Sequence, residues 1–360
     1  MERLAPAPKR IVILRLDRIG DVVLSTPVLL ALRQAYPLSV IAIMVRPPCE
    51  ELLQGHPAVD QVIVYEKEGA HRGIWATVQF ARRLRRLEFD TALVLHPSNR
   101  SHWIPWLAGI PVRIGYDRKC GWLLTHRVPH RKQEGRQHEA AYSLALLNVF
   151  GLTPPAPQLL IPVRNAAAAR IDALLSPHHV GSDARLVAIH PSASCISKRW
   201  MPERFAQVAD RLATEQQARI VLVAGEADAV YAQRVAHAMR QPAVDLAGRL
   251  SLGELAALLA RCRLLISNDS GPVHIAAAVR TPVVDIFGRN QRGLSPLRWG
   301  PLGEGHVVLH KEVGCVTCLA HACDIDFLCL SSLSVEEVYL AATEVLGRGT
   351  KDLGPGKSGG

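Results

Sequence analysis

The stretch Ser267-Asn268-Asp269-Ser270-Gly271-Pro272-Val273-His274-Ile275-Ala276-Ala277-Ala278 carries the strongest local signal of fold in the chain. It continues an apolar run that predicts a buried strand, turns at Asp269 to Gly271, and enters a helix with Pro272 in its first turn. The N–H groups and dipole of such a helix start suit a diphosphate. His274 lies one turn inside, where it either faces the same ligand or is a satisfied core residue.

The same alternation of short β-rich runs and amphipathic helices extends through both halves of the chain. The expected strands are Arg10–Leu16, Ser39–Val45, Gln61–Tyr65, Thr91–Leu95, Leu186–His190, Arg219–Ala224, Leu264–Ser267 and Pro282–Phe287. The expected helices are Leu24–Ala35, His71–Leu87, Pro202–Thr214, Leu252–Arg261, Pro272–Val279 and Val335–Leu346, the last with a capping box at Ser334 and Glu337. Alternation of this kind implies parallel sheets with helices on both faces.

A Pro-rich stretch, Thr153–Pro157, separates the two halves. We therefore predict two doubly wound α/β domains, over residues 1–165 and 183–330, followed by a helix over 334–347. Ligands of such sheets bind at the carboxyl ends of the strands, so the expected site is a cleft across which the two domains face each other.

Composition narrows the choice of partner only in part. The chain has 360 residues and a formal charge of +10, which favours phosphate-bearing partners but is equally explained by an arginine-rich codon bias. No nucleic-acid-binding module is recognisable, and we predict no nucleic-acid partner. No apolar run approaches the roughly 18–20 residues that span a bilayer. The sequence shows no secretory signal, so we expect a cytoplasmic protein whose eight cysteines are mostly reduced.

Two further groups of candidate site residues follow predicted strands. Asp21, in the run Arg15-Leu16-Asp17-Arg18-Ile19-Gly20-Asp21, is a candidate general base toward a sugar hydroxyl. The alternative is that it caps a helix or pairs with its dipole. The small-residue loop after His190 leads to Lys198, and its amides together with that cation can hold a phosphate. The alternative for Lys198 is an ordinary surface lysine.

Five segments in this order resemble glycosyltransferase family 9, the ADP-heptose:lipopolysaccharide heptosyltransferases. They are Leu14–Pro27, Ala108–Tyr116, His138 with the helix after it, Leu246–Leu252 and Ser267–Gly288. The resemblance extends from about Arg10 to Leu346. It implies a GT-B fold of two Rossmann-like domains, with a C-terminal helix that packs back on the first.

The resemblance also implies roles for individual residues. Asp21 matches the family's catalytic base, and Lys198 matches the lysine that holds the donor phosphates. Asp269, Ser270, Gly271 and His274 match the donor-binding turn, and Glu226 matches an acidic position associated with the donor ribose. The implied reaction is inverting transfer of a heptose, or a related sugar, from an ADP-sugar to a lipid-linked anionic glycan such as the lipopolysaccharide core. The enzyme would need no cofactor or metal and would contact the anionic inner membrane peripherally.

Arginines of the first domain are candidate contacts for the acceptor, because guanidinium groups bind carboxylate and phosphate in a bidentate manner. The alternative is a solvated helix face. The candidates are Arg82 and Arg86 on one helix, and Arg113 and Arg118 around a later strand.

Three features depart from the family pattern or remain open. Ser192 stands where relatives often have glycine, and Arg289-Asn290-Gln291 replaces the usual Pro-Thr continuation. Asp285 interrupts an apolar strand, so it needs a partner or must titrate. The cysteines Cys315, Cys318, Cys323 and Cys329 could bind zinc, form disulfides or pack as thiols, and we predict no metal.

Two alternatives to transfer remain open at this stage. A nucleotide-sugar epimerase would share the architecture, and a non-catalytic protein could bind the donor alone.

Overall fold

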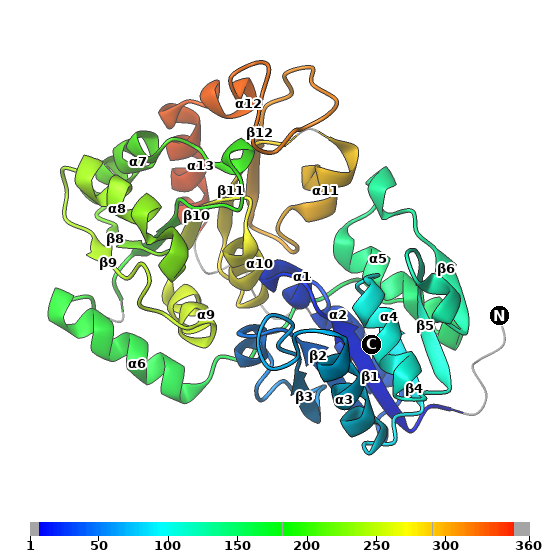
Figure 1. Cartoon of the computed structure of the whole chain (residues 1–360). Coiled ribbons are helices and arrows are strands. Elements are labelled where there is room, and N and C mark those ends of the chain that lie inside the picture. The colour runs from blue at the N-terminus through cyan, green and yellow to red at the C-terminus, as the bar shows by residue number, and fades with distance from the viewer. Residues whose placement is uncertain (1–6, 182, 290, 349–360) are drawn as a thin grey trace, which may run out of the picture. The chain divides into compact units, whose positions relative to one another are not determined.

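The computed structural model describes residues 7–181, 183–289 and 291–348, which form two compact units (Figure 1). Unit 1 comprises the described residues up to Arg164, together with Ser251–Ala256 and Arg292–Leu302. Unit 2 comprises Asn165–Leu250, Ala257–Gln291 and the described residues from Gly303 onward. The main break falls beside the predicted boundary at residue 165, whereas the return of two later segments to unit 1 was not predicted.

Unit 1 contains a sheet of six parallel strands in the order β3-β2-β1-β4-β5-β6. The strands are β1 (Arg10–Arg15), β2 (Val40–Val45), β3 (Gln61–Val64), β4 (Thr91–Val94), β5 (Val112–Asp117) and β6 (His126–Pro129). The strand order reverses between β1 and β4. In doubly wound sheets, polar ligands bind outside the carboxyl ends of the strands at such a switch point.

Helices cover both faces of this sheet because successive side chains of a strand point to opposite faces. On β1, Ile11 and Ile13 share one core with α2 (Thr26–Ala35) and α5 (Glu139–Ala145). Val12 and Leu14 share the other core with α3 (Ile74–Arg85) and α4 (Asn99–Leu107). The short α1 (Ile19–Val23) follows β1 directly.

The sheet of unit 2 repeats this topology, with the order β12-β11-β10-β7-β8-β9. Its strands are β7 (Leu186–His190), β8 (Arg219–Leu222), β9 (Val244–Asp245), β10 (Leu264–Asn268), β11 (Val283–Phe287) and β12 (Val307–His310). Its helices are α6 (Asn165–Leu175), α7 (Pro202–Glu215), α8 (Ala229–Ala238), α10 (Gly271–Ala278), α12 (Leu328–Ser331) and α13 (Val335–Gly347). The helix α11 (Pro296–Trp299) belongs to unit 1, and α9 (Leu252–Arg261) is divided between the two units. Here the order reverses between β7 and β10.

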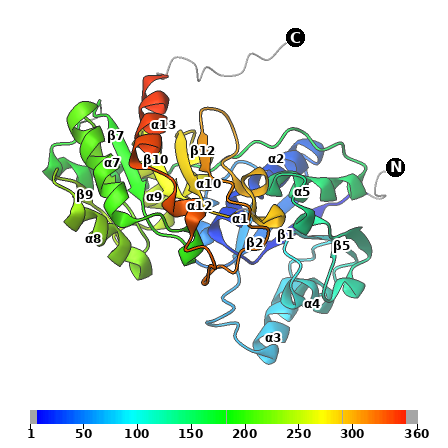
Figure 2. The ribbon, with the colours of Figure 1, turned by 90° about the horizontal axis from the view of Figure 1, so that it is seen from above.

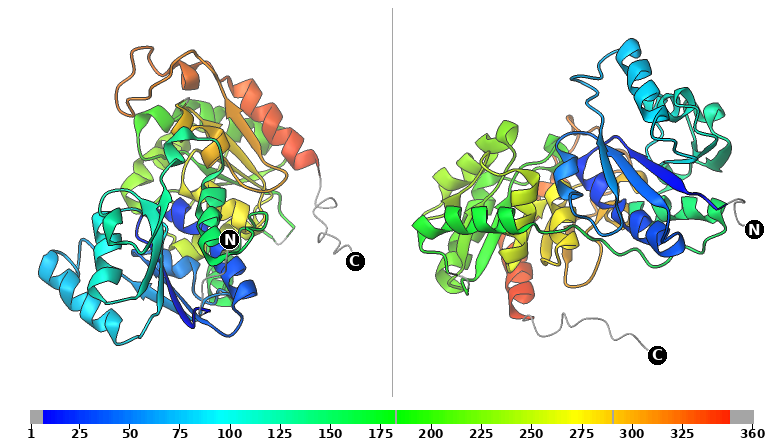
Figure 3. Two further views of the ribbon diagram at one scale, coloured as in Figure 1. Left: turned by 90° about the vertical axis from the view of Figure 1, so that its right-hand side faces the viewer. Right: turned by 90° about the horizontal axis from the view of Figure 1, so that it is seen from below.

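The prediction that the last helix packs back on the first domain is wrong. The buried face of α13, which includes Val338, Ala342 and Val345, lies in one apolar core with α7 and the strands of unit 2. Figure 3 shows α13, in red, alongside those strands. An amphipathic pattern fixes which face of a helix is buried but not which core receives it. The predicted capping box at Ser334 and Glu337 is confirmed.

None of the helices within the described residues is both long enough and apolar enough to cross a bilayer.

Candidate active site

Arg15, the last residue of β1, is the centre of a buried ion cluster in unit 1. Its guanidinium lies 3.0 Å from Asp17 Oδ1, 2.5 Å from Asp21 Oδ1 and 3.3 Å from Glu139 Oε1, and its side chain is only 2% exposed. Asp17 also contacts His96, which follows β4, with 2.8 Å between Oδ2 and Nδ1. Residues after β1 and β4 therefore meet at the switch point, as the topology requires.

Asp21 lies in the first turn of α1, and its side chain is 14% exposed, so the carboxylate still reaches solvent. It does not cap the helix, because the N-cap residue is Arg18. Burial raises the pKa of Asp21 to about 6; Arg15 opposes the shift, and the charges of Asp17 and Glu139 add to it. A carboxylate of higher pKa is a stronger base while remaining ionised at neutral pH.

Glu139, the first residue of α5, binds three cations although its side chain is only 2% exposed. It accepts from Lys132 at 2.6 Å and from the Nε and Nη2 of Arg298 at 3.0 and 2.8 Å, and it also contacts Arg15. Burial alone would raise its pKa, but Lys132, Arg15 and Arg298 together lower the pKa of Glu139 to about 2. Glu139 is therefore ionised, and through Arg15 it helps to hold Asp21 in place.

In unit 2, the loop after β7 and the turn after β10 meet at the corresponding switch point. Lys198 Nζ lies 2.5 Å from Asp269 Oδ2, and the two side chains are 14% and 7% exposed. The sequence predicted both as donor-binding residues from separate motifs, and the structure brings them together. In this pair the charge of Lys198 is largely balanced by that of Asp269.

His190, at the end of β7, holds the neighbouring turns by three hydrogen bonds. Its Nδ1 lies 3.2 Å from Ser267 Oγ and 3.1 Å from Ser270 Oγ, and its Nε2 lies 3.0 Å from Ser192 Oγ. Burial lowers the pKa of His190 to about 4, so the ring is neutral at physiological pH. Ser192, which departs from the family pattern, therefore ties its loop to the end of β7.

The remaining predicted donor residues lie at the same edge of the sheet. Ser270 is the N-cap of α10, Gly271 begins that helix, and His274 is buried within its first turns. Glu226 follows β8 and is exposed, without an ion pair to the other candidates among the described residues. The structure thus groups Lys198, Asp269 and Ser270 closely and leaves Glu226 apart from them.

Asp285 is fully buried on β11, opposite Ser267 of β10. Within the described part of the chain, neither of its carboxylate oxygens has a hydrogen-bond partner. Burial and the nearby charge of Asp269 raise its pKa well above the ordinary value, and Lys198 only partly opposes the shift. Of the two possibilities left open by the sequence, a partner or titration, the raised pKa favours titration.

Arg289 is a cation at this edge that the sequence noted only as a departure from the family. Gly288 packs tightly against the Lys198 loop, because a Cβ there would lie 2.5 Å from Ser197 O. Arg289 Nη2 donates to Cys195 Sγ at 2.8 Å, while its Nε is buried and has no hydrogen-bond partner among the residues described. Burial alone would raise the pKa of Cys195, but Ser197, Arg289 and Lys198 outweigh it and lower the pKa.

The predicted acceptor arginines do not gather around Asp21. Arg113 lies at the start of β5 and donates to the carbonyls of Ile110 and Leu123, so it occupies the amino edge of the sheet. Arg82 and Arg86 lie at the end of α3, which runs back toward that same edge before β4 begins. Their position argues against contact with the group that Asp21 would deprotonate. Arg118 follows β5 at the carboxyl edge and remains a candidate.

The cysteines are thiols in this structure. Cys315, Cys318 and Cys323 lie close enough to Cys329 for their charges to contribute to its raised pKa, although burial is the larger cause. Among residues 7–181, 183–289 and 291–348, no group of three or more His, Cys, Asp or Glu side chains is placed to hold a metal ion.

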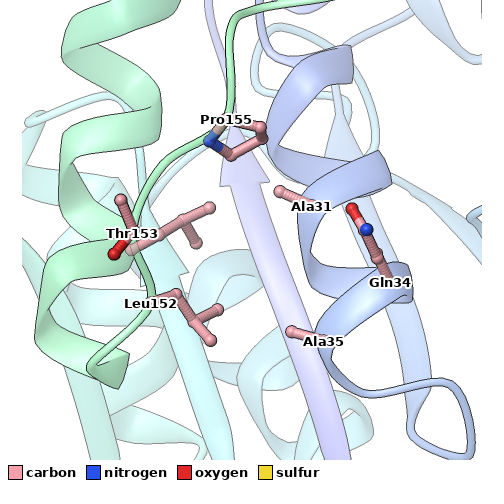
Figure 4. A pocket seen from close by; sticks show the side chains of 7 residues that line it. Ala31, Gln34, Ala35, Leu152, Thr153 and Pro155 are labelled. Atoms are coloured by element: carbon pink, nitrogen blue, oxygen red, sulfur yellow. The ribbon is translucent and has the colours of Figure 1, made fainter. Parts of the chain in front are cut away.

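A cavity of about 340 Å³ in unit 1 lies away from these residues (Figure 4). It is lined by Ala31, Gln34 and Ala35 of α2 and by Leu152, Thr153 and Pro155 of the connecting segment. Its walls carry no charged side chain, so it does not provide the chemistry that the sequence predicts.

Sequence reasoning missed Arg15, Lys132, Glu139 and Arg298 as parts of one cluster. The one local signal was His138 at the start of a helix, which was noted as part of a family motif. His138 is indeed the N-cap of α5 and accepts from Ala140 N at 3.2 Å.

Two Rossmann-like units, each with charged residues at its switch point, define the GT-B architecture shared by many glycosyltransferases. Residues 77–328 match glycosyltransferase family 9 (heptosyltransferase). Lipopolysaccharide heptosyltransferase 2 of Salmonella typhimurium is 27% identical over 287 residues, covering 77% of this chain and 82% of that protein. The chain therefore belongs to glycosyltransferase family 9 and is a glycosyltransferase.

Solved structures agree with this assignment. A family 9 glycosyltransferase from Veillonella parvula superposes with a TM-score of 0.83 at 27% identity, covering 95% of this chain and 98% of that one. The ADP-heptose LPS heptosyltransferase II of E. coli shares the fold, with a TM-score of 0.78 at 23% identity over 94% of this chain and 99% of that one. The predicted GT-B fold is confirmed.

Proposed function

We propose that this enzyme transfers a heptose, or a closely related sugar, from ADP to a lipid-linked anionic glycan such as the lipopolysaccharide core, with inversion at the anomeric carbon. Two of the three relatives named above are heptosyltransferases, and one of these is named for ADP-heptose. The observation that carries the proposal is Asp21, a partly exposed carboxylate with a pKa of about 6 at the carboxyl edge of unit 1. Peripheral contact with the anionic inner membrane is part of the proposal.

In the proposed reaction, Asp21 removes the proton from the acceptor hydroxyl as its oxygen attacks the anomeric carbon of the donor. The bond from that carbon to the diphosphate breaks, and ADP leaves with the electron pair. Direct displacement from the opposite face inverts the anomeric configuration. Arg15, held by Glu139, keeps the Asp21 carboxylate in one orientation.

Groups of unit 2 stabilise the departing diphosphate. The N–H groups of Ser270 and Gly271 at the start of α10 carry the positive end of a helix dipole. Lys198 contributes a further donor. Preorganised donors of this kind stabilise the charge that develops on a leaving group.

A transfer assay tests the function directly. We expect ADP-heptose and a lipid-linked core acceptor to give a glycosylated product of inverted configuration, followed by mass spectrometry and by NMR of the anomeric proton. Thermal-shift titration with a panel of nucleotide diphosphates should show the largest stabilisation by ADP. Conversion of the donor sugar without an acceptor would favour an epimerase, and donor binding without any turnover would favour a non-catalytic protein.

The pH profile of transfer should have an acid limb near pH 6. Because its pKa is raised to about 6, Asp21 is protonated below that pH and cannot accept the acceptor proton, so kcat should rise as pH increases through the limb. His190 has a pKa lowered to about 4, so it does not titrate in this range. ADP affinity, measured by calorimetry across the same range, should not follow the limb. A rate that does not change through pH 6 would contradict the assignment.

We expect Arg289 to contribute to ADP affinity, although it stands in a segment that departs from the family pattern. Lys198 is paired with Asp269, whereas Arg289 forms no ion pair within the described part of the chain. A hydrogen bond to a charged group contributes about 1.5–3 kcal/mol. We therefore expect Arg289→Gln to weaken ADP binding by about 10- to 100-fold in calorimetry.

The matched control is Arg263→Gln, which removes the same charge at the start of β10, the opposite edge of the sheet. It should leave ADP affinity within a few-fold of the wild type. Equal effects of the two substitutions would show that only the net charge matters.

A further inference from the structure

The basic helix α3 is the feature that the proposed reaction does not use. The segment from Gly69 to Leu87 holds five arginines and no acidic residue. Its Phe80, Ala81 and Leu84 are buried against the sheet, so the arginines cannot belong to the core. As described above, Arg82 and Arg86 also lie at the edge of the sheet away from Asp21.

The exposed side of α3 forms a continuous stripe. Trp75, Gln79, Arg82 and Arg86 are spaced as i, i+4, i+7 and i+11, which places them on one face of a helix, and all four are exposed. At 1.5 Å per residue the stripe is about 16 Å long. Arg83 and Arg85 flank it, and Arg85 is held in place by its bonds to the carbonyls of Leu107 and Ala108.

An aromatic residue of high exposure stands at the start of this stripe. Trp75 is 79% exposed and its neighbour Ile74 is 67% exposed. The adjacent helix α4, which lies beside α3 on the same face of the sheet (Figure 2), adds Trp106 at 49% exposure. Large apolar side chains exposed beside clustered arginines mark a binding surface rather than an ordinary solvated helix face.

We propose that the stripe Trp75–Gln79–Arg82–Arg86 is a docking surface for an anionic lipid bilayer. Arginines near a bilayer are attracted by anionic headgroups, and tryptophan prefers the boundary between headgroups and hydrocarbon. The buried face of α3 stays in the core, so the helix lies on the membrane without inserting into it. The inference rests on the proposed function in one respect, since a lipid-linked acceptor gives the enzyme a reason to reach a membrane.

The test measures binding of the full-length protein to vesicles, without donor or acceptor, so a failure of the proposed reaction would not affect it. We expect sedimentation with vesicles of phosphatidylcholine and phosphatidylglycerol, little binding to phosphatidylcholine alone, and weaker binding as salt is raised. Each arginine near an anionic surface contributes roughly a fivefold factor, so Arg82→Gln with Arg86→Gln should weaken binding by about 25-fold.

The control is the double substitution Arg240→Gln with Arg263→Gln, which removes the same charge from two exposed arginines of unit 2. It should change vesicle binding by less than about threefold, because neither arginine belongs to the stripe on α3. If both pairs weakened binding equally, net charge alone would account for it and the docking surface would be disproved.

Trp75 gives a second and independent measurement. Brominated lipids should quench the tryptophan fluorescence of the bound protein, and Trp75→Phe combined with Trp106→Phe should remove most of that quenching. Substitution at these exposed sites is not expected to unfold α3 or α4, which circular dichroism checks. Persistence of the quenching in this double variant would overturn the proposal. So would a stripe variant that loses affinity for an RNA oligonucleotide while its binding to anionic vesicles is unchanged.

Discussion

Asp21→Asn should reduce the rate of sugar transfer by about 10²- to 10⁴-fold, the range that a positioned general base contributes. The amide has nearly the volume of the carboxylate and can still accept from Arg15, so α1 should keep its position. It cannot take a proton from the acceptor. ADP affinity should stay within about twofold, because the residues proposed to hold the donor belong to unit 2. Initial rates and calorimetry measure the two effects separately.

Asp17 provides the matched control for this substitution. It is paired with the same guanidinium, at 3.0 Å from Arg15 Nε, and its side chain is 15% exposed, much like that of Asp21. If Asp21 is the base, Asp17→Asn should reduce the transfer rate less than Asp21→Asn does. Its effect would be indirect, because Arg15 would be held less firmly. A larger loss in Asp17→Asn would identify Asp17 as the base. Near-normal transfer by Asp21→Asn would remove Asp21 from the mechanism.

The central strands could be predicted because nearly all of their residues are apolar. In a parallel sheet covered on both faces, strands are short apolar runs bounded by turn residues. The predicted Arg10–Leu16 and Leu264–Ser267 correspond to β1 (Arg10–Arg15) and β10 (Leu264–Asn268). The edge strand β9 was missed because it is only two residues long, Val244–Asp245, and has no apolar run of its own.

The candidate site could be predicted where the chemistry is local. Lys198 and Asp269 were found from their own turns, although their ion pair joins two loops distant in sequence. The Glu139 cluster had no such signal, because Arg15 and Arg298 lie 124 and 159 residues away from it. A charged residue in an amphipathic helix ordinarily indicates a solvated face. Residues 292–302 return to unit 1 in the folded chain, and this return brings Arg298 to Glu139. The sequence alone does not indicate it.

Glu139→Gln should lower the free energy of unfolding of unit 1 by about 3–5 kcal/mol, the usual cost of removing one partner from a buried ion pair. The glutamine fits the site, but Arg15, Lys132 and Arg298 lose their shared anion while remaining buried or half-buried. Since the chain has two units, urea unfolding should be followed by hydrogen exchange of peptides from β1 and α5, which report on unit 1 alone.

The pH dependence and a matched control separate the buried charge from other effects of this substitution. Because the pKa of Glu139 is lowered from 4.5 to about 2, its contribution is present above pH 4.5 and is lost as pH falls toward 2, so wild type and variant should converge there. Glu337 on α13 also has a pKa lowered to about 2, chiefly by Lys311, but its side chain is 39% exposed. Glutamine can replace it in the capping box, and a solvent-screened pair contributes only about 0–1 kcal/mol. Equal losses from Glu139→Gln and Glu337→Gln would show that burial of the charge does not set the stability of the cluster around Arg15.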